Sequence, residues 1–91
     1  MSVVVDNQFV EDARVYLVRG ETPILLGRVG SFESRTFRLG PGLLPANAEV
    51  RLRVRPLNGR LYDAPAVLAN PGDHVIWRLG PRLELSSVIV R

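Results

Sequence analysis

Apolar and polar residues alternate along much of this chain, and the alternation is strictest from Glu49 to Arg55. Successive side chains of a β-strand point to opposite faces, so this pattern predicts a strand that buries Val50, Leu52 and Val54. The stretch therefore indicates a half-buried strand whose solvent-facing side concentrates positive charge. We call its three cations the arginine ladder; they are Arg51, Arg53 and Arg55.

Seven or eight short strands can be placed by the same pattern, each bounded by Gly, Pro, Asn or Asp. No segment has a convincing apolar period of 3.6 residues, so no helix is predicted. A strand about every ten residues is typical of a sandwich or a barrel. We therefore predict an all-β fold with Trp77 at the centre of the core. The expected strands are Ser2 to Asn7, Ala13 to Arg19, Ile24 to Val29, Ser34 to Leu39, Ala48 to Pro56, Tyr62 to Leu68, Asp73 to Leu79 and Leu83 to Arg91.

The composition is that of one ordinary globular domain spanning residues 1 to 91, with 46% hydrophobic and 23% charged residues. Cysteine is absent, which excludes disulfide bonds and thiolate metal sites. All 12 cationic residues are arginine, and nine acidic residues reduce the net charge to +3. A GC-rich genome would explain the lack of lysine. The functional alternative is bidentate binding of carboxylate or phosphate, which arginine performs better than lysine.

The apolar runs are too short to cross a membrane. The longest, such as Ile24 to Leu26, fall far below the roughly 20 residues that a spanning helix needs. Met1 leads almost directly into the strand-like run Val3 to Val5, without the basic and long apolar regions of a signal peptide. We expect no membrane span and a cytoplasmic location, or a periplasmic or extracellular one if a signal peptide has been removed.

The sequence offers little catalytic chemistry. His74 is the single histidine, and its neighbour Asp73 would point to the opposite face of the same strand. The acidic residues are dispersed, and neither a nucleophile-elbow motif nor a glycine-rich phosphate loop is present. We therefore predict no catalytic, metal-binding or cofactor-binding residues, and a protein that is not an enzyme.

Two interpretations of the arginine ladder stay open. Its guanidinium groups could pair across strands with Glu33, Glu84 or another carboxylate, or they could bind an anionic ligand or partner. Sheet surfaces that bind nucleic acid usually interleave aromatic residues with cations, and the ladder has none, so nucleic acid is an improbable ligand. Tyr16 and Tyr62 would weaken that objection if they lay on a neighbouring outer face.

Apolar strands lie near both ends of the chain. Such strands usually pair within the sheet of their own domain. The alternative is an exposed edge that pairs with a neighbouring molecule and builds an oligomer or a fibre. The candidate edge residues are Val3, Val4, Val5, Val88, Ile89 and Val90.

Several segments resemble a known group of small bacterial envelope-associated β-domains. The segments are Ala13 to Gly20, Leu26 to Val29, Thr36 to Leu39 and Asn70 to Leu79. The nearest named type is the PEGA-like domain, although the Pro-Glu-Gly-Ala signature itself is absent. The resemblance implies an immunoglobulin-like or transthyretin-like sandwich in the cell envelope. It also implies a non-catalytic spacer or interaction role.

These observations favour an antiparallel β-sandwich of seven or eight strands that acts as a structural or protein-interaction module. Its partner would be another protein or a second copy of itself, joined through edge strands. The alternative is an anion-binding domain that holds nucleic acid or an acidic glycan on the arginine ladder. Affinity in that case would fall steeply with salt.

Overall fold

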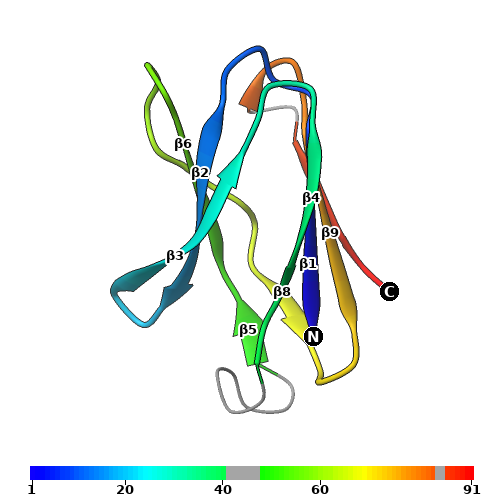
Figure 1. Ribbon diagram of the computed structural model, residues 1–91. Helices are drawn as coiled ribbons and strands as arrows, with labels where there is room; N and C mark the ends of the chain where they lie inside the picture. The colour runs from blue at the N-terminus through cyan, green and yellow to red at the C-terminus, as the bar shows by residue number, and fades with distance from the viewer. Residues whose placement is uncertain (41–47, 84–85) are drawn as a thin grey trace.

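A computed structural model of the chain describes residues 1–40, 48–83 and 86–91. Within these residues the chain forms ten β-strands and no α-helix, which confirms the predicted all-β class (Figure 1). The strands are β1 (Ser2–Asn7), β2 (Ala13–Arg19), β3 (Thr22–Val29), β4 (Ser34–Arg38), β5 (Ala48–Val50), β6 (Leu52–Pro56), β7 (Tyr62–Asp63), β8 (Val67–Ala69), β9 (His74–Leu79) and β10 (Ser87–Val90).

The strands form two four-stranded sheets and one two-stranded sheet. The first sheet has the order β10-β9-β1-β4, the second has the order β3-β2-β6-β7, and β5 pairs with β8 alone. Figure 1 shows the two larger sheets as facing layers. One pairing departs from the expected antiparallel arrangement, because β1 and β9 run parallel, from Ser2 opposite His74 to Asn7 opposite Leu79.

A single apolar core lies between the two larger sheets. Both contribute fully buried side chains to it, and Trp77, with 0% of its surface exposed, is the largest, which confirms its predicted place. The buried face predicted for the Glu49 to Arg55 stretch is also confirmed. Val50, Leu52 and Val54 are 1%, 2% and 0% exposed.

The expected continuous strand from Ala48 to Pro56 is wrong in one respect, because it breaks at Arg51. Residues before the break pair with β8, whereas those after it pair with β2 and β7. The expected strand from Tyr62 to Leu68 is likewise divided into β7 and β8, with Pro65, which has no N–H to donate, between them. The apolar and polar residues keep alternating through the break at Arg51, because β5 and β6 bury the same face of the chain although they belong to different sheets.

A β-bulge in β3 decides which side chains of that strand face outward. Tyr16 lies opposite Leu25, but Val15 lies opposite Gly27, so Leu26 is an extra residue. Without the bulge, residues three apart would point to opposite faces of the sheet. The bulge therefore places both Leu25 and Arg28 on the outer face.

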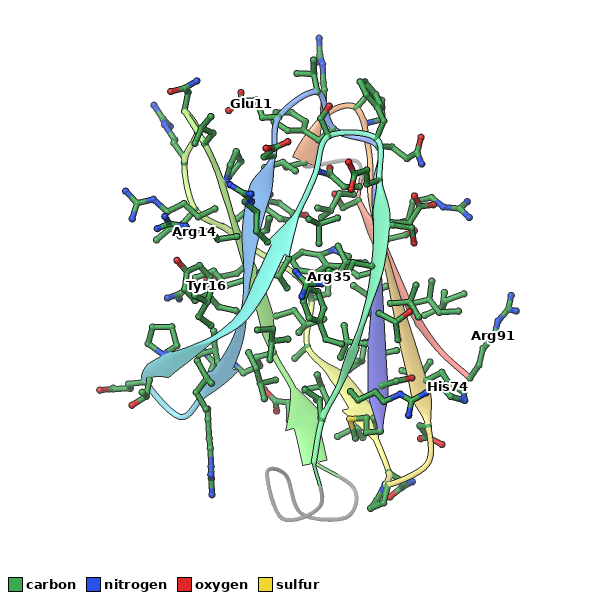
Figure 2. All side chains as sticks on the ribbon, in the orientation of Figure 1. Glu11, Arg14, Tyr16, Arg35, His74 and Arg91 are labelled. Atoms are coloured by element: carbon green, nitrogen blue, oxygen red, sulfur yellow. The ribbon has the colours of Figure 1, made fainter. Side chains whose placement is uncertain are left out.

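Gly27 permits a close approach between the edges of the two sheets. Its φ is +157°, and a Cβ added there would lie 2.7 Å from Cε1 of the buried Phe37 on β4. The Arg35 guanidinium lies 4.9 Å from the centre of the Phe37 ring and donates a hydrogen bond of 2.9 Å to the carbonyl oxygen of Arg28. Figure 2 shows Arg35 between β3 and β4. These contacts hold the bulged strand against β4.

Asn7 is the one polar residue among the buried side chains of the described chain. Its Nδ2 group donates to the carbonyl oxygens of Glu11 at 3.0 Å, Gly30 at 3.1 Å and Val29 at 3.4 Å. Its Oδ1 accepts a hydrogen bond of 2.9 Å from the backbone N–H of Phe9. The end of β1 is thereby joined to the loops that follow β1 and β3.

We expect Asn7→Ala to lower the free energy of unfolding by about 2 to 3 kcal/mol, because it removes the hydrogen bonds that a fully buried side chain makes to three segments of backbone. Urea denaturation would measure the loss. Asn58→Ala, at an exposed turn position, is the matched control and should change stability by less than about 0.5 kcal/mol. Equal effects of the two substitutions would contradict the role given to Asn7.

Candidate anion-binding site

Three arginines lie side by side on the outer face of the β3-β2-β6-β7 sheet. Arg28 on β3 and Arg55 on β6 are the direct cross-strand partners of Arg14 on the strand between them. All three are exposed. Side chains directly opposite each other start from Cβ atoms about 5 Å apart, so three like charges are held together here. We call this set the arginine row.

No ion pair or hydrogen bond of the described residues engages the side chains of the arginine row. The ion pairs among the described residues join Arg53 to Asp63 and Arg78 to Asp6, and neither includes an arginine of the row. Asp12 borders the row, but its Oδ1 accepts a hydrogen bond of 2.8 Å from the backbone N–H of Ser31. The guanidinium groups of the row can therefore donate to a ligand.

A pocket of about 240 Å³ opens beside the row. Its walls combine the three guanidinium-bearing side chains with backbone and apolar atoms from the ends of β2 and β6. A carboxylate or phosphate group placed there could accept hydrogen bonds from more than one arginine. The lining residues are Asp12, Ala13, Arg14, Arg28, Arg55, Pro56 and Leu57.

Tyr16 extends this face with an aromatic ring. It is half-buried, it follows Arg14 by two positions on β2, and its cross-strand partners are Leu25 and Arg53. Figure 2 shows Arg14 and Tyr16 on the same side of β2, away from the other large sheet. Tyr62 lies on the opposite face, because it is the partner of the buried Val54 and packs against the core. One aromatic residue, Tyr16, therefore lies on the same face as the cations, whereas Tyr62 does not.

The structure separates the members of the arginine ladder. Arg55 belongs to the arginine row, whereas Nη1 of Arg51 donates to the carbonyl oxygen of Gly20 at 3.1 Å. Arg53 pairs with Asp63 on β7 through two hydrogen bonds, of 2.6 Å from Nε and 3.3 Å from Nη2. Of the carboxylates expected as partners, Glu33 lies in the loop before β4 and Glu84 lies outside the described residues.

The Arg53 and Asp63 pair shifts both groups towards their charged forms. Their mutual hydrogen bond raises the pKa of Arg53 and lowers the pKa of Asp63. Because the pKa of Asp63 is lower in the folded chain, the pair adds stability at pH values above the ordinary range of an aspartate. That stability is lost as the pH falls through the lowered pKa. Arg53 is thus committed to a partner within the chain.

Sequence reasoning missed Arg14 and Arg28. The alternation from Ala13 to Leu17 places Arg14 on an outer face, but its neighbours depend on strand order, which alternation does not report. Arg28 reaches that face only through the bulge. A glycine inside a strand pattern often marks a bulge, so Gly27 was the available signal.

The candidate edge strands have different outcomes. β1 lies between β9 and β4 and pairs with both, so the expectation of edge pairing through Val3, Val4 and Val5 is wrong. Its backbone hydrogen-bonding groups are already used within the sheet. Strand β10 does lie at the edge of its sheet, where Val88, Ile89 and Val90 pair with β9 alone among the described strands.

His74 contacts a hydroxyl group but lacks the other parts of a catalytic site. Its Nδ1 lies 2.5 Å from Oγ of Ser2, on the exposed face of the first sheet. The neighbouring Asp73 carboxylate accepts a hydrogen bond of 2.8 Å from the backbone N–H of Asn70 instead of orienting the imidazole. A triad needs a carboxylate on the far side of the histidine ring. This pair therefore does not form one.

Neither a metal site nor a membrane-spanning helix is found among the described residues. The described residues contain no group of three or more His, Cys, Asp or Glu side chains able to hold a metal ion. They also contain no helix that is long and apolar enough to cross a membrane.

Comparison of the chain with protein-family models, curated proteins and solved structures gives no match. The arginine row and its pocket are the strongest candidate on the described surface.

We expect Arg14→Gln to stabilise the fold by about 0.2 to 1 kcal/mol at low ionic strength, because it removes the central charge of three like charges. The gain should shrink as salt screens the repulsion. Thermal unfolding over a range of sodium chloride concentrations would measure both effects. Destabilisation by Arg14→Gln at low salt would show that the row is paired in solution and would contradict the arrangement described.

Proposed function

We propose that this protein is a non-enzymatic binding module that holds an anionic group of its partner on the arginine row. The observation that carries the proposal is the direct cross-strand placement of Arg28, Arg14 and Arg55 without a carboxylate partner in the described chain. Such an arrangement is electrostatically unfavourable in the free protein. An anion bound between the guanidinium groups would relieve the repulsion, so binding and stability are coupled.

The chemistry of the row favours planar or tetrahedral oxyanions. Guanidinium groups donate paired hydrogen bonds that match the geometry of carboxylate and phosphate. Tyr16, two positions after Arg14 and on the same face of β2, offers a ring against which a flat part of the ligand could stack. Arg53 contributes less, because Asp63 already neutralises it. The proposed ligand is therefore a phosphate-bearing or carboxylate-bearing molecule, as in the anion-binding alternative, but held by a different set of arginines.

For the architecture, we propose a β-sandwich of the immunoglobulin-like or transthyretin-like kind. Two four-stranded sheets that share one core support this assignment. The cell-envelope location implied by the PEGA-like resemblance stays a prediction. So does self-assembly through an edge strand, for which the place of β10 at the edge of the first sheet leaves Val88 to Val90 as the candidate segment.

The binding proposal can be tested by calorimetric titration of the protein with inorganic polyphosphate over a range of salt concentrations. We expect Arg14→Gln combined with Arg55→Gln to reduce the slope of log affinity against log salt by about two, because two phosphate contacts are lost. The matched control is Arg38→Gln combined with Arg91→Gln, which removes the same charge from exposed positions of the other sheet and its end.

The control should keep most of the affinity and slope of the unmodified protein. Since the variant of the row is expected to be at least as stable as the parent, unfolding would not explain its loss of binding. If both double variants lose the same affinity for polyphosphate, binding depends only on the net charge of the protein, and the proposed site is wrong.

A further inference from the structure

One end of the molecule exposes large apolar side chains on its loops. The loops that follow β1, β3, β6 and β9 gather at this end, at the top of Figure 1, and both chain termini lie away from it. The other exposed large apolar side chains of the described chain, Leu25, Leu68 and Ile89, lie on three different strands, whereas four stand on the loops of this one end. We call them the apolar tips; they are Val10 (65% exposed), Phe32 (65%), Leu57 (74%) and Leu61 (55%).

Phe32 is held in a conformation that suits glycine better. Its φ is +58°, in the left-handed region, and it sits in a turn closed by a hydrogen bond of 3.0 Å from the N–H of Glu33 to the carbonyl oxygen of Gly30. A bulky residue in this region is strained. Burial does not offset the strain, because about two thirds of the side chain is exposed (65%). Backbone strain without a packing benefit points to a role outside the fold itself.

Cations lie beside two of the apolar tips, Leu61 and Leu57. Arg60 and Arg82 line an open hollow of about 470 Å³ together with apolar atoms of Phe9, Leu61 and Leu83. On the neighbouring side, Leu57 lines the pocket of the arginine row. Leu57 therefore belongs both to the apolar tips and to the wall of the proposed anion site.

Two of the carboxylates at this end accept hydrogen bonds from backbone N–H groups, whereas Glu33, beside Phe32, is exposed. Oε1 of Glu11 accepts a hydrogen bond of 2.7 Å from the N–H of Asn58, and Oδ1 of Asp12 accepts one from the N–H of Ser31. These bonds join the loops to each other. Ionised carboxylates cannot donate hydrogen bonds, so the charged side chains that can donate to a lipid phosphate, among the described residues of this end, are arginines.

We propose that this end docks on the surface of a bilayer that contains anionic lipids. The apolar tips would enter the boundary between headgroups and acyl chains, and the arginine row, with Arg60 and Arg82, would contact lipid phosphates. This inference rests on the proposed anion-binding function and names its partner. Apolar side chains flanked by cations match the two layers of an anionic membrane interface, apolar within and negative at the surface.

The arrangement of the tips favours a membrane over a protein partner. The tips stand on several separate loops at one end of the sheets and do not form one flat apolar face. The loops that follow β6 and β9 enclose a hollow between them. A fluid interface can accommodate side chains spaced in this way, whereas a protein surface would need a matching relief. Both described ends of the chain lie away from the contact (Figure 1).

The test is sedimentation of the full chain with vesicles of phosphatidylcholine, either alone or mixed with phosphatidylserine. We expect binding to the mixed vesicles and binding at least about tenfold weaker to the neutral ones. Phe32→Gly combined with Val10→Ser should reduce binding to the mixed vesicles by about tenfold or more, because it removes apolar surface from two tips that do not line the pocket of the arginine row.

The matched control is Leu68→Ser combined with Ile89→Thr, which changes two apolar residues that are 70% and 44% exposed and lie on β8 and β10. It should bind mixed vesicles as the parent does. Glycine relieves the strain at residue 32, so the tip variant should not melt at a lower temperature than the parent. A thermal scan thereby separates lost docking from unfolding.

Polyphosphate titration distinguishes the failure of this inference from that of the proposed function. The tip variant should keep the parent's affinity for polyphosphate, whereas the Arg14→Gln and Arg55→Gln variant should lose both ligands. Undiminished vesicle binding by the tip variant would overturn the docking proposal, as would a parent that binds polyphosphate but no vesicles. A parent that binds neither would overturn the anion-binding function as well.

Discussion

The shared core between the two large sheets constrains everything else in this protein. Each strand must turn alternate side chains into that core, so the remaining positions are fixed on the outer faces. Arginine is the only cation in the sequence, and many outer positions carry it. Strand order and register then decide which of these arginines become neighbours. The arginine row is thus a by-product of how β2, β3 and β6 bury their other face.

Alternation predicted which residues are inside but not which strands are neighbours. The bounds of β1 and β2, the buried face around Leu52 and the central place of Trp77 all follow from local patterns. The break at Arg51 does not, because the chain passes from one sheet to another without changing the face it buries. The pairing of β1 with both β9 and β4 is also invisible locally, since it depends on contacts between distant parts of the chain.

The candidate site shows the same division. Arg55 could be found because its strand alternates strictly, but its partners depend on register. Asp63 neutralises Arg53 because β7 places a carboxylate directly opposite that residue and none beside Arg55. A bulge of one residue moves Arg28 onto the face of Arg14. Two arginines that look equivalent in the sequence therefore differ chemically, one being paired within the chain and the other open to a ligand.

The parallel pairing of β1 with β9 has a consequence for the order of events during synthesis. β1 precedes the other strands, yet Ser2 finds its partner in His74, near the far end of the domain. Until β9 has left the ribosome, one edge of β1 has no strand to pair with. The domain therefore cannot complete its first sheet as it is translated, and its folding belongs to the period after the last strands emerge. Through that interval the valines of β1 lack part of the cover that the finished sheet gives them.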